Sequence, residues 1–292
     1  MKKSSIKGYI NSIIAAVSYG TNPLFALPMY SHGLGVNSVL FYRYFFAVLL
    51  YGVWLIFIKR VSLKITIKQF FIIFGLAIVF ALSSLFLFDS FNYIDSGVAC
   101  TILFSYPLMI ALISKIFFKE NLPKIIWAAM LIIILGISLL YSGNGENISL
   151  KGICLVLLSG LSYAIYMVAV KHVKEIKHIK PDKLTFYVML LGLSVFVCNL
   201  KFCTELQPLN SPFVLICGLL LAIFPTIISL ETITIGIRLI GAVKTAVLGA
   251  LEPLTALFFG ILLFGESLTF KIICGIILIL FGVILVITSK RN

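Results

Sequence analysis

The chain has 292 residues, of which 61% are hydrophobic and only 11% are charged, and its mean hydropathy is +1.17. A soluble domain of this length could not bury so much apolar surface, so the composition excludes a soluble protein. The net charge of +13 comes from lysines and arginines spread over six separate segments, which argues against binding to nucleic acid. The composition predicts an integral membrane protein.

Ten apolar runs are long enough to be membrane-spanning helices. A bilayer core of about 30 Å takes roughly 20 apolar residues per helix, and these runs are far too long for the strands of a barrel. In chain order, the predicted spans are 8–27, 37–58, 69–90, 96–117, 123–141, 150–170, 183–201, 212–235, 239–264 and 269–288. The short connections leave no room for a soluble domain, so any function must reside within the helix bundle.

The positive charges predict which ends of the helices face the cytoplasm. If both termini are cytoplasmic, the inner segments hold 19 of the 23 lysines and arginines, and the outer segments hold only Lys151, Lys201 and Lys271. Arg43 completes the total and lies within the second span. This asymmetry predicts a multi-pass protein of the cytoplasmic (inner) membrane with both termini in the cytoplasm.

Two distant stretches of the chain resemble each other. YPLMIALISKIFFKENL begins at Tyr106 and EPLTALFFGILLFGESL begins 146 residues later, at Glu252. This shift pairs Pro107 with Pro253, Glu120 with Glu266, and Gly136 with Gly282, and a shift of 144 pairs Gly8 with Gly152 and Tyr19 with Tyr163. Because five is odd, a second half of five spans enters the membrane from the opposite side. We therefore predict an all-α integral membrane protein with ten transmembrane helices in two inverted five-helix repeats, residues 1–146 and 147–292. The first span is expected to be retained rather than cleaved as a signal peptide, since it has a counterpart in the second repeat.

The order of these motifs resembles the EamA-type branch of the drug/metabolite transporter superfamily. The likeness rests on SYG in the first span, the arginine of FYRYFFA in the second, the proline and GE-like loop of each half, and the closing phrase GESLTFKIICGIILILFGVILV. The first half departs from the pattern, with Lys119 where the second has Gly265 and Pro123 where the second has Thr269. The resemblance implies a ten-helix bundle that transports a small metabolite, and similarity to metabolite exporters favours efflux of an amino acid or a related compound.

Polar residues present in only one repeat are candidates for contacts with an asymmetric substrate. Glu252 is expected at the bilayer midplane, where an ionised carboxylate costs at least about 2.5 to 3.5 kcal/mol. Its counterpart is Tyr106. Substrate contact, proton uptake or a structural hydrogen bond would each account for it. Arg43 is expected one to two turns into the second span, where it either forms a structural ion pair with Asp89 or binds an anion or carboxylate.

The first span is interrupted by SYGTNPLF, and such breaks are tolerated where they face protein or a wet cavity. Tyrosines at the starts of both halves either line a central cavity or pack and anchor at interfaces. The predicted substrate-binding residues are Tyr19, Asn22, Arg43, Tyr106, Tyr163, Tyr166 and Glu252. The predicted hinges are Pro23, Pro107 and Pro253, because each proline removes one helical hydrogen bond.

Residues shared by both repeats are interpreted as scaffold. Glu120 and Glu266 precede the fifth and tenth spans, where a carboxylate can cap helix N–H groups or meet interfacial water. Small residues seven apart, Ala129 with Gly136 and Gly275 with Gly282, predict close helix packing, within one chain or across a homodimer.

The sequence favours a secondary transporter over three alternatives. It has no GxxxxGK[ST] phosphate loop for ATP chemistry, and neither HExxH nor GxSxG for an intramembrane enzyme. A channel would carry polar residues along a continuous path, whereas here they gather near mid-membrane; a non-transporting scaffold is the other alternative. No metal-ligand cluster, catalytic residue or cofactor is predicted. The expected partners are a small-molecule metabolite, the lipid bilayer and, by default, a coupling proton, for a monomer or a homodimer.

Overall fold

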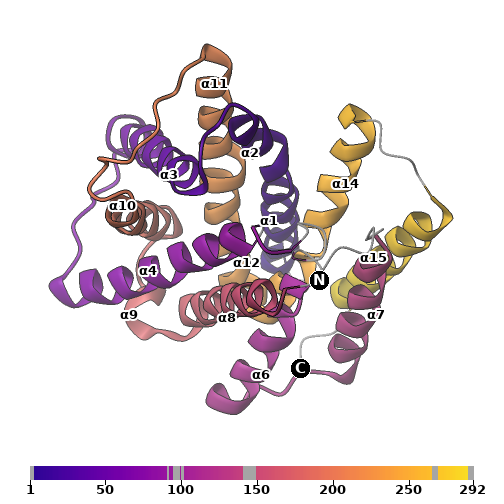
Figure 1. The fold of residues 1–292 in the computed structure, drawn as a ribbon. Helices are drawn as coiled ribbons and strands as arrows, with labels where there is room; N and C mark the ends of the chain where they lie inside the picture. The colour runs from indigo at the N-terminus through magenta and orange to yellow at the C-terminus, as the bar shows by residue number, and fades with distance from the viewer. Residues whose placement is uncertain are drawn as a thin grey trace.

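The computed structural model describes residues 3–90, 92–94, 99, 102–140, 149–264 and 269–288, and in these residues the regular structure is entirely helical (Figure 1). Seven of the described helices are long and apolar enough to cross a membrane. Two shorter apolar helices, Tyr106–Phe118 and Lys124–Leu140, accompany them. The chain is thus a multi-pass membrane protein.

Each predicted span contains helix in the structure. In the first half the helices are α1 (Lys3–Gly20), α2 (Asn22–Ser31), α3 (Val36–Val53), the π-helical turn η1 (Trp54–Ile58), α4 (Ile67–Ser90), α6 (Tyr106–Phe118) and α7 (Lys124–Leu140). In the second half they are α8 (Leu150–His172), α9 (Lys174–Lys177), α10 (Pro181–Asn199), α11 (Pro212–Ala222), the π-helical turn η2 (Ile223–Ile228), α12 (Ser229–Ile240), α13 (Ala242–Leu248), α14 (Leu251–Phe264) and α15 (Phe270–Thr288).

Prolines mark where the helices break. The predicted interruption in the first span is present, because α1 ends at Gly20 and α2 begins at Asn22. Pro107 and Pro253 lie in the first turns of α6 and α14, after short breaks at 104–105 and 249–250. The N–H groups in the first turn of a helix have no acceptor within the helix, so a proline there loses no hydrogen bond and fits without strain. The kinks predicted within continuous helices are therefore breaks between separate helices.

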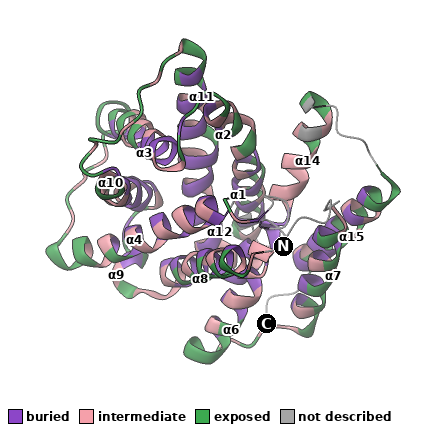
Figure 2. Cartoon of the chain, in the orientation of Figure 1, coloured by how far each residue is buried: buried purple, intermediate pink, exposed green. Residues whose placement is uncertain are grey.

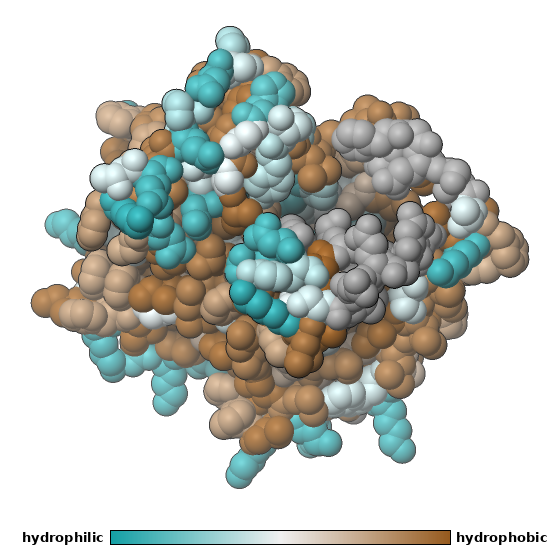
Figure 3. Space-filling view, viewed as in Figure 1, coloured by the Kyte–Doolittle hydropathy of each residue, from teal (hydrophilic) through white to brown (hydrophobic). Residues whose placement is uncertain are grey.

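The surface and interior follow the membrane setting. Figure 2 shows buried residues concentrated along the central helices α1, α4, α8 and α12. Large apolar side chains face outward, including Phe57 (71% exposed) and Phe117 (74% exposed). Figure 3 shows hydrophobic side chains over much of the visible face and hydrophilic ones mainly toward its upper left and lower edge. Exposure of this kind is suited to contact with lipid.

The two halves pack on each other in a reciprocal pattern. Helix α1 packs against α12, while its counterpart α8 packs against α4, the counterpart of α12. Likewise α14 contacts α1, and α6 contacts α8. A Cβ added at Gly8 would lie 2.5 Å from Ile240 Cγ2, and one added at Gly152 would lie 2.6 Å from Ile94 Cγ2. These two isoleucines are themselves 146 residues apart, so matched residues meet matched partners.

Helices α7 and α15 form a close antiparallel pair at one edge of the molecule (Figure 1). A Cβ at Gly136 would lie 2.9 Å from the Gly275 carbonyl oxygen, and a Cβ at Gly282 would lie 3.1 Å from the Ala129 oxygen. Residue numbers increase along α7 in the direction in which they decrease along α15, so the two helices are antiparallel. The predicted close packing of these small residues is confirmed between two helices of the same chain.

Candidate functional site

A small cavity lies between the two halves of the chain. The first half contributes Tyr19, Arg43 and Phe80, and the second contributes Tyr163, Pro225, Thr226, Ser229, Leu230 and Ile233. Its volume of about 10 Å³ suits roughly one water molecule. Pockets for small molecules have volumes of about 300 to 1,000 Å³. The cavity in this structure is therefore much smaller than a pocket for a small organic molecule.

Aromatic rings form one wall of the cavity. Tyr19 and Tyr163, which occupy matching positions in the two halves, both line it. The Tyr163 ring centroid lies 6.2 Å from that of Phe80 and 5.1 Å from that of Tyr106. Tyr106 thus stands behind Tyr163 rather than in the lining. The rings of this wall present apolar surface to the cavity, and the hydroxyl groups of the tyrosines lie near it.

Arg43 of α3 is the charged residue of the cavity lining, and only 1% of it is exposed. Its Nε donates to Thr226 Oγ1 at 2.7 Å, and its Nη2 donates to the Pro225 carbonyl at 3.1 Å. Its Cζ lies 5.5 Å from the centre of the Tyr19 ring, a cation–π distance. Its remaining nitrogen, Nη1, is buried and has no hydrogen-bond partner in the part of the chain that the structure describes.

The π-helical turn η2 builds the seat for Arg43. Pro225 has no N–H, so the carbonyl of Leu221 loses its usual helical donor. The Thr226 hydroxyl donates to that carbonyl at 2.9 Å and accepts from Arg43 Nε, so one hydroxyl satisfies both groups. Turns of this kind inside helices are frequent at functional sites. The sequence prediction missed these residues, although a Pro–Thr pair in the apolar run 212–235 was the available signal.

The predicted ion pair between Arg43 and Asp89 is wrong. Asp89 lies near the end of α4, where its Oδ1 accepts from Asn92 Nδ2 at 3.1 Å. The ion pairs between described residues do not include one from Arg43 to any carboxylate. Arg43 instead donates to the Pro225 carbonyl and to the Thr226 hydroxyl of η2.

Glu252 lies in the first turn of α14, at the break that follows α13, and is partly exposed. A Cβ added at Gly20 would lie 2.5 Å from the Glu252 carbonyl oxygen, so α1 can approach α14 here only because residue 20 is glycine. A Cβ at Gly249 would lie 3.4 Å from Glu252 Oε1 and would overlap the Tyr106 hydroxyl. Among the described residues, the Glu252 carboxylate has no hydrogen-bond or ion-pair partner.

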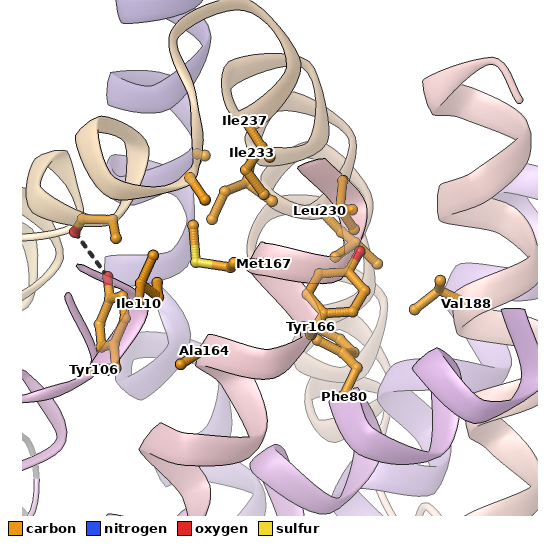
Figure 4. Packing of buried hydrophobic residues seen from close by; sticks show 14 of the residues in the cluster. Phe80, Tyr106, Ile110, Ala164, Tyr166, Met167, Val188, Leu230, Ile233 and Ile237 are labelled. Atoms are coloured by element: carbon orange, nitrogen blue, oxygen red, sulfur yellow. Dashed lines mark hydrogen bonds between the residues drawn. The ribbon is translucent and has the colours of Figure 1, made fainter. Parts of the chain in front are cut away.

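Tyr106 is buried and bridges the two halves. Its hydroxyl donates to the Ala246 carbonyl in α13 at 3.1 Å, as the dashed line in Figure 4 shows. Tyr106 and Glu252, which are counterparts in the two repeats, thus meet at the α13–α14 break.

Besides Tyr106 and Glu252, the structure places Tyr166 and Asn22 away from the cavity lining. Tyr166 is fully buried against Phe80, with ring centroids 4.8 Å apart, and packs in the core (Figure 4). Asn22 begins α2, and its buried Oδ1 has no hydrogen-bond partner from any described residue. Next to it, Pro23 is exposed. The site therefore comprises Tyr19, Arg43 and Tyr163 at the cavity, with Tyr106 and Glu252 beside it.

Polar contacts join the halves at both ends of α3. At the end predicted to be cytoplasmic, Lys59 forms an ion pair with Asp182 at 2.7 Å, and the Tyr51 hydroxyl donates to Glu231 at 2.6 Å. At the other end, Gln207 bonds the turn before α3. Its Oε1 accepts from the backbone N–H of Gly35, and its Nε2 donates to the Gly33 carbonyl at 3.0 Å.

Glu120 also contacts the opposite half. Its carboxylate forms an ion pair with Lys171 and lies 3.3 Å from His172 Nε2. Helix α7 begins only at Lys124, so Glu120 is not its N-cap, and the predicted capping role is replaced by this pairing. Glu266, its counterpart, lies outside the described residues.

Comparison with known proteins places the chain in a family. The model of the EamA-like transporter family matches twice, over residues 6–142 and 150–288. An uncharacterized transporter of Synechocystis sp. is 29% identical over 210 residues, covering 70% of this chain and 62% of that protein. Uncharacterized transporters of Bacillus subtilis and Archaeoglobus fulgidus are 26% and 27% identical, over 65% and 85% of this chain, and the matches cover 62% and 87% of those proteins.

A solved crystal structure shares the fold. It superimposes with a TM-score of 0.82, covering 95% of this chain and 97% of that one, at 15% sequence identity. The double match of the family model covers nearly the whole chain, and the relatives are named as transporters. The chain therefore belongs to the EamA-like transporter family.

Proposed function

We propose that the chain is a secondary transporter that moves a small metabolite, an amino acid or a similar compound, out of the cell across the cytoplasmic membrane. It works by alternating access of two inverted five-helix repeats, residues 1–146 and 147–292, with ten membrane helices and both termini in the cytoplasm. It has no ATP chemistry of its own, and a proton is the coupling ion.

The cavity between the halves is the observation that carries this proposal. Both halves contribute to its lining, so any rocking of one half against the other changes its size and its access. Inverted-repeat transporters place their substrate near the midplane at such a repeat interface. The polar contacts at the two ends of α3 are the connections that would have to open in turn.

The packing supports the inverted arrangement. Reciprocal contacts, in which each half presents the same elements to the other, are those of an isologous interface with a two-fold relation. The fifth helix of each half, α7 and α15, is antiparallel to its counterpart. Antiparallel counterparts are expected when the second half enters the membrane from the opposite side.

Uptake into proteoliposomes from a labelled pool of amino acids and small metabolites tests the proposal. We expect saturable uptake of one compound or one group of related compounds, compared with protein-free liposomes. Flux that rises linearly with concentration would point to a channel, and the absence of flux for every compound would contradict a transporter of metabolites.

A further inference from the structure

We propose that Arg43 receives the negatively charged group of the transported metabolite, and that the substrate is an amphipathic organic carboxylate. The inference rests on the proposed transport function and names the substrate class for the same cavity.

The first step is the hydrogen-bond inventory of Arg43. The guanidinium has five N–H donors, and the seat formed by Pro225 and Thr226 uses only Nε and Nη2. Arg43 lines the cavity, and its Nη1 group is buried with no acceptor among the described residues. A buried donor left unsatisfied is costly, and such groups in native proteins call for a ligand, a water or an ion.

The second step is the charge. Arg43 is 1% exposed and has no ion-pair partner among the described residues. The positive charge of the guanidinium is therefore uncompensated by any carboxylate of the described residues. A carboxylate supplies two acceptor oxygens and the missing charge, and pairs well with guanidinium.

Arg238 shows what a structural arginine does in this protein. Both of its terminal nitrogens donate to backbone carbonyls, Nη1 to Ile179 at 2.5 Å and Nη2 to Ile176 at 3.1 Å. It lies outside the cavity lining. Its Nε is buried without a partner among the described residues, as Nη1 of Arg43 is, so the two differ in that Arg43 lines the cavity and has an unpaired terminal nitrogen.

The third step is the remaining lining, which decides between an inorganic and an organic anion. Tyr19, Phe80 and Tyr163 present rings to the cavity, and Leu230 and Ile233 add aliphatic surface. A hydrated inorganic ion gains nothing from such walls, whereas the carbon skeleton of an organic acid is stabilised by burial against them. The small cavity does not hold such a molecule, so binding follows a separation of the halves, which would also release Arg43 from Pro225 and Thr226 of the other half.

The experiment uses reconstituted full-length protein and a labelled mixture of amino acids, 2-oxo acids and aromatic carboxylates, together with neutral sugars and nucleosides and cationic amines. The carboxamide of each transported acid is then added as a competitor. Arg43→Gln is compared with Arg238→Gln, which removes an arginine away from the cavity.

We expect saturable uptake only of compounds with a carboxylate, and carboxamides that compete at least about tenfold more weakly, since hydrogen bonds to charged groups are strong. Arg43→Gln should raise the KM about tenfold or more. Arg238→Gln should lower the yield of folded protein without moving the KM. If Arg43→Gln does not fold, the carboxamide competition with the wild-type chain decides alone.

The outcomes separate the two proposals. Saturable uptake of a neutral or cationic compound, or equal competition by acid and carboxamide, would overturn the role of Arg43 and leave the transporter standing. A KM for the acid that Arg43→Gln leaves unchanged would do the same. The absence of saturable uptake for every compound would remove both proposals.

Discussion

Glu252 and Arg43 are charged residues of opposite sign that lie in different halves of the chain. The aromatic side chains of Tyr19, Tyr106 and Tyr163 connect the surroundings of one residue with those of the other. Neither has an ion-pair partner among the described residues. Charged groups within the membrane are expensive unless they face water, a substrate or a proton. Their places beside the repeat interface, rather than on the lipid face, are those expected of functional groups.

Replacing Glu252 with glutamine tests its part in transport. The amide keeps the shape of the side chain but can neither ionise nor take up a proton. We expect the maximal rate of saturable uptake in proteoliposomes to fall about tenfold or more, the size of effect associated with a proton-transfer group. Glu205→Gln, which changes an exposed carboxylate paired with Lys201, should keep the wild-type rate. Equal rates for both variants would show that Glu252 is structural.

Replacing Thr226 with valine tests the seat of Arg43. Valine keeps the shape but removes the hydroxyl that accepts from Arg43 and donates to Leu221, so two buried groups lose their partner. The expected loss is about 1 to 3 kcal/mol, observed as a lower thermal unfolding midpoint in detergent. Thr288→Val, at the exposed end of α15, should shift stability by no more than about 0.5 kcal/mol. The same midpoint for both variants would contradict the hydrogen bonding described here.

The sequence predicts part of this site. Symmetry between the repeats identified Tyr19 and Tyr163, and both line the cavity. It could not identify the partner of Arg43, because the choice between Asp89 and Thr226 depends on how α3 and η2 pack in three dimensions. Tyr166 was predicted as a substrate-binding residue, and it lies three residues after Tyr163. Three residues are slightly less than one helical turn, so its side chain points in a different direction and packs in the core against Phe80.

At the scale of elements, glycines set how closely helices approach. A Cβ at Gly136 would lie 2.8 Å from Ile279 and 2.9 Å from a backbone oxygen of α15, and backbone cannot yield as a flexible side chain can. A Cβ at Gly75 of α4 would meet nothing within 4 Å. Gly136 and Gly75 therefore serve as a test position and a control position for the effect of an added methyl group.

Gly136→Ala should destabilise the protein by about 1 to 3 kcal/mol through overpacking of α7 against α15. Gly75→Ala should be neutral or stabilising by up to about 1 kcal/mol, because alanine is the better helix former. Thermal unfolding in detergent separates the two. A Gly136→Ala variant at least as stable as Gly75→Ala would mean that the α7–α15 contact is looser than described.

Gln207 connects the loop before α11 to the turn before α3, at the end predicted to face outward. Gln207→Ala removes its bonds to Gly33 and Gly35 and should favour opening at that end. In a background lacking the native cysteines, a cysteine at Ser229 in the cavity lining should react about threefold faster with an impermeant maleimide added from outside, since each lost bond is worth about 0.5 to 1.5 kcal/mol. Glu205→Ala, in the same loop, provides the control. An unchanged rate would exclude Gln207 from the closure of that end.

The helices themselves were largely predictable, and their breaks less so. Apolar length and the positive charges predict the positions of the spans, and SYGTNPLF predicts the break between α1 and α2. At Pro107 and Pro253 the sequence predicted kinks, whereas the structure has separate helices. A proline removes the same hydrogen bond in either case, and only packing against the opposite half decides how far the helix opens.

For the whole molecule, the two halves form one unit through paired contacts. Contacts such as Gly8 with Ile240 and Gly152 with Ile94 repeat between the halves. Equivalent residues therefore make the same close contact at two places in the molecule. The repeat in the sequence predicts that two similar halves exist. It does not predict which helix of one half meets which helix of the other, because that depends on the axis relating them.

The proposed alternating access requires two ways to tilt one half against the other, one open to each side of the membrane. Under that proposal, the small cavity corresponds to a state between them. In this state the contacts of Lys59 and Asp182 at one end and of Gln207 at the other are present together.

Counterflow in proteoliposomes tests alternating access most directly. Vesicles are loaded with an unlabelled transported compound, and the labelled compound is added outside at a much lower concentration. Alternating access predicts that the label accumulates transiently above its equilibrium level, because a carrier that returns loaded exchanges one molecule for another. Label that only equilibrates, with no overshoot, would contradict alternating access and indicate a pore instead.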